Sequence, residues 1–143
     1  MMAMVLMSAM PAGATYIGDL STTDGTLDGY GGWTGDTSLS WEVDHNTVDN
    51  SWTYNYTWAS PPGNLSHIDV EVSEGTLPSE LWAFSPIENW EGVQVYNEKT
   101  GDSIYGIKYN VLDGDQGGVV DFSFTSSHAP MWGDIYAKDG VFK

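Results

Sequence analysis

The chain has 143 residues, of which 20 are Asp or Glu and only four are Lys or Arg, so its formal net charge at pH 7 is −16. A surface this acidic repels nucleic acids and anionic membranes, and we expect neither as a partner. The absence of cysteine excludes disulfides, zinc–thiolate centres and cysteine nucleophiles. The length suits one domain with a single hydrophobic core.

The first ten residues, MMAMVLMSAM, are apolar and uncharged, and Pro11 and the small residues Ala12-Gly13-Ala14 follow them. This order is typical of the apolar region and cleavage site of a secretory signal peptide. We therefore interpret 1–14 as part of a signal peptide and 15–143 as a single domain. The apolar run is shorter than the roughly 20 residues that a membrane helix needs, so no membrane span is expected. Alternatively, the segment is retained and packs as a strand, which a neighbouring copy could receive.

Alternating apolar and polar residues indicate strands in the first half of the chain. Thr15 to Leu20 suits a short strand, and Ser38 to Asp44 is expected to pair with Ser51 to Ser60 as a hairpin. We expect Trp41 to lie between two sheets, where its replacement by Ala would cost roughly 3–5 kcal/mol. The second strand of the hairpin carries four large rings on one face: Trp52, Tyr54, Tyr56 and Trp58.

The second half of the chain continues the alternation. Between Glu74 and Trp90 it is lost, and only Pro78 to Leu81 suits one helical turn. About eight short strands without a long helix predict an all-β fold, a two-sheet antiparallel β-sandwich of jelly-roll or immunoglobulin-like kind. The further strands are expected at Leu65 to Ser73, Gly92 to Asn97, Ser103 to Val111, Val119 to Thr125 and Met131 to Lys138. Of these, Gly92 to Asn97 and Ser103 to Val111 are expected to pair as a second hairpin.

Exposed aromatic side chains are the first kind of candidate site, because their ring faces stack on the C–H groups of sugars. In the strand expected from Met131 to Lys138, Trp132 and Tyr136 lie opposite the face of smaller residues. These two are therefore candidates for contacts with carbohydrate. The row from Trp52 to Trp58 is an alternative, but four large rings in strict alternation fit the space between two sheets better.

Acidic residues give weaker candidates. Asp113 and Asp115 lie in a Gly-rich loop of the kind that binds calcium, but ordinary turn chemistry explains them equally well. His67, Asp69 and Glu71 share one strand face, where same-face neighbours lie about 6.8 Å apart, too far to share one ion without converging. We interpret these three as separate polar residues, and Asp69 with Glu71 as only a weak glycosidase pair. Apart from calcium, no cofactor is expected.

Three segments carry a resemblance to a known group: HAPMWGDIYAKDG from His128 to Gly140, YGIKYNV from Tyr105 to Val111, and LSHIDVEVS from Leu65 to Ser73. The chain from about Leu20 onward resembles the globular region of bacterial PEP-CTERM proteins, which exosortase sorts after export. Proteins of this group share a signal peptide, a β-rich domain and a C-terminal Pro-Glu-Pro motif with a membrane helix and a basic tail. No such tail precedes Lys143, and whether one follows stays open.

The resemblance implies a secreted or cell-surface bacterial protein of the extracellular matrix or biofilm. We expect a non-enzymatic protein whose partners are exopolysaccharide or further copies of itself, in the latter case assembled into filaments. The alternative is a discrete carbohydrate-binding module that uses exposed Trp or Tyr. A hydrolase acting on polysaccharide is a third hypothesis, although no nucleophile motif accompanies any of the three His.

Overall fold

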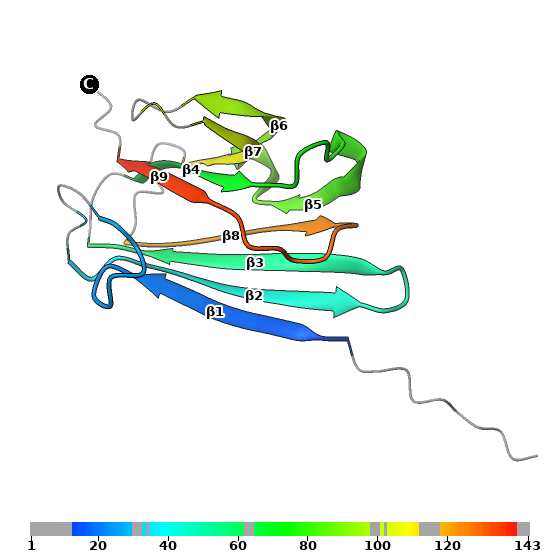
Figure 1. Cartoon of the computed structure of the whole chain (residues 1–143), viewed down its shortest axis with the longest axis horizontal. Helices are drawn as coiled ribbons and strands as arrows, with labels where there is room; N and C mark the ends of the chain where they lie inside the picture. The colour runs from blue at the N-terminus through cyan, green and yellow to red at the C-terminus, as the bar shows by residue number, and fades with distance from the viewer. Residues whose placement is uncertain are drawn as a thin grey trace, which may run out of the picture.

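The structure is a computed structural model that describes residues 13–29, 33, 35–61, 65–97, 101, 103–111 and 118–139. Within these residues the chain forms two antiparallel sheets, which confirms the predicted β-sandwich. The sheets have the strand orders β1-β2-β3-β8-β5 and β6-β7-β4-β9 (Figure 1). Helical structure in this part of the chain is limited to short 3-10 turns, and none of its helices has the length and apolar character of a membrane span.

The five-stranded sheet contains the predicted β2–β3 hairpin and one strand that the sequence did not reveal. In β5, Ala83 has a positive φ of 52°, and the pairing register with β8 shifts between Trp82 and Ser85. Such an irregular strand breaks the period of two by which strands are recognised. The strands of this sheet are β1 (Thr15–Ser21), β2 (Ser38–Asn46), β3 (Ser51–Ala59), β5 (Leu81–Ser85) and β8 (Val119–Ser126).

The four-stranded sheet contains the predicted β6–β7 hairpin. Its last strand begins only at Ile135, so the prediction of one strand from Met131 to Lys138 is wrong for the first half of that range. There the main-chain N–H of Asp134 bonds to the side chain of Glu71, which takes the segment out of a regular ladder. The elements are β4 (Leu65–Glu71), η2 (Pro78–Glu80), η3 (Ile87–Asn89), β6 (Trp90–Asn97), β7 (Ser103–Asn110) and β9 (Ile135–Asp139).

A layer of aromatic rings fills the space between the sheets. Phe122 of β8 stacks on Tyr56 of β3 with ring centroids 5.2 Å apart, and on Tyr109 of β7, in the opposite sheet, at 4.9 Å. Trp90 of β6 meets Phe122 edge-on at 5.8 Å. Ile68 of β4 is fully buried in the same core. The predicted inward face of β3 is therefore confirmed.

The two sheets do not cover each other completely. In Figure 1, β1 and β2 lie on the side of the molecule away from β6 and β7. Trp41 of β2 shares the inward face as predicted, but it is only partly buried, at the margin of the core. Its ring lies against Gly18 of β1, where an added Cβ would come within 2.3 Å of it. Trp41 thus borders the open side of the sandwich instead of its centre.

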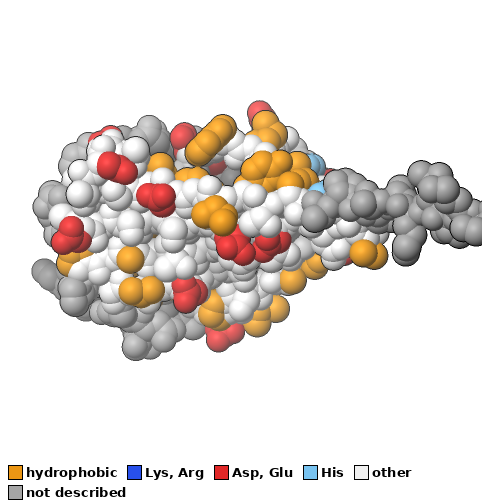
Figure 2. All heavy atoms as spheres, turned by 90° about the horizontal axis from the view of Figure 1, so that it is seen from below, with side chains coloured by type: hydrophobic (Ala, Val, Ile, Leu, Met, Phe, Trp, Pro, Cys, Tyr) orange, Lys and Arg blue, Asp and Glu red, His pale blue; other side chains and the backbone are white. Residues whose placement is uncertain are grey.

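The outer face of the five-stranded sheet is polar. Side chains that lie opposite each other in the register bond across strands: the Thr57 hydroxyl donates to Asp121 at 2.6 Å, and that of Thr15 to Asp44 at 2.9 Å. On the side of the molecule drawn in Figure 2, acidic side chains are scattered among the described residues and no Lys or Arg is visible. On this face, the Asp and Glu side chains that make the composition acidic therefore lie at the surface.

Replacing Phe122 by Ala should lower the free energy of unfolding by about 3–5 kcal/mol, because the ring is 2% exposed and stacked on both sides. Trp41→Ala should cost only about 1–2 kcal/mol, since part of that ring already faces solvent. Urea denaturation of both variants tests whether Phe122→Ala lowers the free energy of unfolding more than Trp41→Ala does. A larger loss for Trp41→Ala than for Phe122→Ala would contradict the placement of the core.

Candidate functional site

Two adjoining hollows flank the segment that leads from β8 to β9. The first pocket, of about 290 Å³, lies on the side of His128 and Thr76. The second hollow, of about 340 Å³, lies between β1, β2 and the start of β9. The stretch from Met131 to Gly133 borders both of them. We call the second hollow the aromatic groove, because five of its lining residues carry large rings: Tyr16, Trp41, Tyr54, Tyr56 and Trp132.

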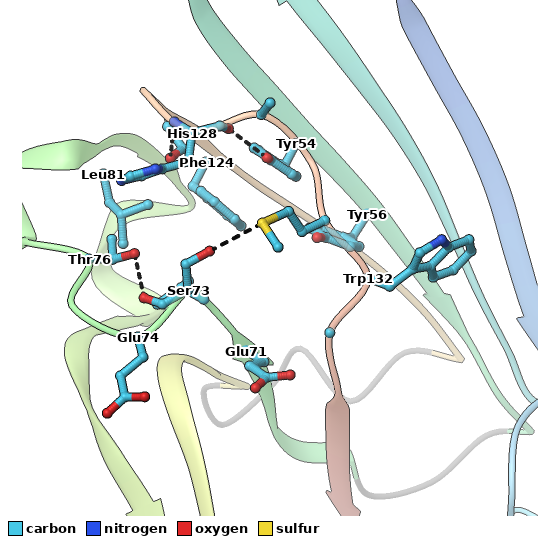
Figure 3. A pocket seen from close by; sticks show the side chains of 15 residues that line it. Tyr54, Tyr56, Glu71, Ser73, Glu74, Thr76, Leu81, Phe124, His128 and Trp132 are labelled. Atoms are coloured by element: carbon cyan, nitrogen blue, oxygen red, sulfur yellow. Dashed lines mark hydrogen bonds between the residues drawn. The ribbon is translucent and has the colours of Figure 1, made fainter.

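A right-angled pair of tryptophans forms one corner of the aromatic groove. Trp132 is 89% exposed, and its ring centroid lies 6.1 Å from that of Trp41 with the two planes at 89°. Figure 3 shows Trp132 pointing away from the first pocket. The pair offers a ligand one open ring face with a second ring as a wall beside it, an arrangement suited to the apolar face of a sugar.

Hydrogen bonds on either side hold the segment that carries Trp132. The Tyr54 hydroxyl donates to the carbonyl of His128 at 2.8 Å. The N–H of Asp134 donates to Oε2 of Glu71 at 2.5 Å, and the N–H of Glu71 donates to the carbonyl of Asp134 at 3.0 Å. Trp132 is thus exposed on a segment anchored at both ends, which reduces the entropy lost when a ligand binds.

The tyrosines in the wall of the groove are held in their neutral form. Burial raises the pKa of Tyr54 to about 12. Burial also raises the pKa of Tyr56 well above its usual range, and the neighbouring Tyr54 adds to this effect. Both residues line the aromatic groove and the first pocket. Near neutral pH both hydroxyls are protonated, as the bond that Tyr54 donates to the carbonyl of His128 requires.

A contact between His128 and Glu80 beside the first pocket supports the loop. Nε2 of His128 lies 3.2 Å from Oε2 of Glu80, and the same carboxylate accepts the N–H of Leu77 at 2.7 Å. The bond from Leu77, followed by that from His128, lowers the pKa of Glu80. The contact with His128 joins η2 to the segment after β8. The N–H of Ser127, which donates to the carbonyl of Glu80 at 3.1 Å, joins the same two segments, so we assign the contact a structural role.

The structure does not bring the two aromatic candidates together. Trp132 lies in the aromatic groove, whereas Tyr136 of β9 is paired with Asp69 and has its ring 6.3 Å from that of His67. The partner of Trp132 is Trp41, which sequence reasoning placed in the core. One signal was available: an isolated glycine inside a strand, here Gly18, often marks the close approach of another group.

The acidic candidates also differ from expectation. His67 and Asp69 are buried, with Asp69 0% exposed, and lie next to each other, so their interpretation as separate polar residues is wrong. Nζ of Lys108 lies 3.6 Å from Oδ1 of Asp69, and Nε2 of His67 lies 4.0 Å from Oδ2, because β7 and β9 flank β4 on both sides. Glu71, in contrast, is exposed beside the aromatic groove. The proposed glycosidase pair is therefore split between two environments.

Asp113 and Asp115, the calcium candidates, lie outside the described residues. Within the described part of the chain, no group of three or more His, Asp or Glu is placed to hold a metal ion. Comparisons with models of protein families, with curated proteins and with solved structures find no match to this chain. The aromatic groove is therefore interpreted from its own chemistry.

Replacing Gly18 by Ala should displace the Trp41 ring, because the new Cβ would come within 2.3 Å of it. We expect a change in the near-ultraviolet circular dichroism, to which close ring pairs such as Trp41 and Trp132 contribute. Gly92→Ala is the matched control, since nothing lies within 4 Å of its added Cβ. Identical spectra for the Gly18 variant and the parent would contradict the contact.

Tyr54 and Tyr56 should ionise only at a pH above that of ordinary tyrosines, whose pKa is about 10. Because their folded-state pKa values are raised, their contribution to stability is complete below pH 10 and is lost as the pH rises toward 12 and beyond. Absorbance titration at alkaline pH should show a late phase, which shrinks in Tyr54→Phe. A titration in which every tyrosine ionises near pH 10 while the protein stays folded would refute this assignment.

Proposed function

We propose that this protein is a non-enzymatic carbohydrate-binding β-sandwich that holds glycan in the aromatic groove. The observation that carries the proposal is the right-angled pair of Trp41 and the 89% exposed Trp132. Exposed apolar side chains that gather in one place mark sites for a ligand or partner, and Met131 beside Trp132 is also 80% exposed. Sugars suit this corner, because their C–H faces stack on aromatic rings while their hydroxyls reach polar groups.

The groove supplies such polar groups next to its rings. Glu71 and Asp134 border it, and carboxylates accept hydrogen bonds from sugar hydroxyls. The Tyr54 and Tyr56 side chains border it as well. With a volume of about 340 Å³, the groove is at the small end of ligand sites, which suits one or two sugar units of a longer polymer. The adjoining first pocket offers room for the polymer to continue past Trp132.

Export to the extracellular matrix or biofilm is part of this proposal, and it is supported by the resemblance to PEP-CTERM proteins and by the apolar N-terminal run. Exopolysaccharide is then the available ligand. Self-assembly into filaments through the N-terminal segment 1–14 stays a prediction, because residues 1–12 lie outside the described part of the chain. A strand donated by a neighbouring copy would add to a sheet edge. Strand β1 forms one edge of the five-stranded sheet, and its Ile17 is 76% exposed.

Trp132→Ala should weaken binding to soluble oligosaccharides at least about fivefold, since loss of one stacked ring costs roughly 1–3 kcal/mol. Isothermal titration calorimetry against a panel of matrix-type oligosaccharides measures the effect. Trp82→Ala is the matched control, because Trp82 is also exposed but lies on β5 and borders neither hollow.

The panel should include neutral, amine-bearing and uronic acid-bearing oligosaccharides of the same length. Binding that Trp132→Ala abolishes and Trp82→Ala leaves intact would support the proposal. Binding that survives in Trp132→Ala, or the absence of binding to the whole panel, would overturn it.

A further inference from the structure

The charges around the aromatic groove indicate which class of glycan binds there. This inference rests on the proposed glycan-binding function. Among the described residues that line the groove, Glu71 and Asp134 are acidic and none is Lys, Arg or His. Oε2 of Glu71 would lie 2.9 Å from a Cβ added to Gly133, so this carboxylate lies beside the residue that follows Trp132. Rings and negative charges therefore occupy the same small site.

A protonated amine is the group that both features attract. A cation near the face of a Trp ring is stabilised by the electron density of the ring, with an optimum within about 6 Å of the ring centre. The carboxylates of Glu71 and Asp134 add direct attraction at short range. The net charge of −16 raises the local concentration of cations at the surface and lowers that of anions. Uronic acid or sulfated polymers are disfavoured for the same reason.

We propose that the glycan bound in the aromatic groove carries free, protonated amino groups, as in a partly or fully deacetylated amino-sugar polymer. Its sugar ring stacks on the exposed face of Trp132, and its ammonium group meets the carboxylates of Glu71 and Asp134. Acetylation of the amine removes the positive charge and so removes the electrostatic part of the attraction. The degree of acetylation of the polymer then controls how tightly the protein is held in the matrix.

The test compares three oligosaccharides of equal length: a β-1,4-linked glucosamine oligomer, its fully N-acetylated counterpart and the corresponding glucose oligomer. Calorimetric titrations near pH 6 keep the amines largely protonated and the carboxylates ionised. We expect the glucosamine oligomer to bind about tenfold more tightly than the other two at low salt. This preference should fall as the salt concentration rises, because screening weakens contacts between exposed charges.

Glu71→Gln and Asp134→Asn should each weaken binding of the glucosamine oligomer about fivefold. Each should weaken binding of the glucose oligomer less, because an amide oxygen still accepts hydrogen bonds from sugar hydroxyls but carries no charge to attract an amine. Glutamine at position 71 keeps an oxygen to accept the Asp134 N–H, so the loop stays anchored. Glu88→Gln on η3 is the matched control, because it removes one exposed carboxylate that borders neither hollow.

Two failures are distinguishable. Equal, salt-independent binding of all three oligomers would overturn the amine preference and leave the glycan-binding function standing. Absence of binding to all three would overturn the glycan-binding function together with the preference. A preference for the glucosamine oligomer that Glu88→Gln weakens as much as Glu71→Gln would also refute the inference, because it would show a general effect of net charge.

Discussion

The stack of Tyr56, Phe122 and Tyr109 is the interaction on which the rest of the structure depends. Phe122 lies between a ring of its own sheet and a ring of the opposite sheet, so this one layer fixes where the two sheets meet. The chain has no cysteine, and no disulfide can do this instead. Tyr56 lies 53 positions before Tyr109 (109 − 56 = 53), and the three rings come from three different strands, so the stack forms only when β3, β7 and β8 have come together.

The position of this stack also determines where the aromatic groove opens. The sheets are centred on β3 and β8 on one side and on β4 and β7 on the other, and β1 and β2 extend past the cover of the four-stranded sheet. Along β2, Leu39 is 2% exposed, whereas Trp41 on the same face is only partly buried. The inward face of β2 thus contributes Leu39 to the core and Trp41 to the aromatic groove, because the four-stranded sheet covers only part of the five-stranded one.

The fold could be predicted from the sequence where apolar and polar residues alternate along a strand. Strict alternation in β2, β3, β7 and β8 gave the fold class, the hairpins and the inward face of Trp41 and Tyr56. It could not give β5, where the positive φ of Ala83 interrupts the strand, nor the irregular chain before Ile135. Both depend on contacts between distant segments, such as the bond from Asp134 to Glu71.

The candidate site was harder to predict than the fold for the same reason. Trp132 was identified as an exposed ring, but its neighbour Trp41 lies 91 positions earlier (132 − 41 = 91) and meets it only in the folded chain. Exposure of a single ring says little about binding. The second ring and the adjacent carboxylate of Glu71 make the position distinctive, and neither relation is visible in a local sequence window.

The scarcity of basic residues links the core of the four-stranded sheet to the chemistry of the groove. The chain has only four Lys or Arg, and one of them, Lys108, lies 3.6 Å from the buried Asp69 and over the ring of Tyr96 at 4.5 Å. A carboxylate buried in that position needs a cation nearby, since charge is costly to remove from water. Lys108 therefore serves the interior, and the described lining of the groove contains no basic side chain to neutralise Glu71 and Asp134. Their negative charge is left for a ligand to meet, which is why an amine on the sugar is the group that completes the site.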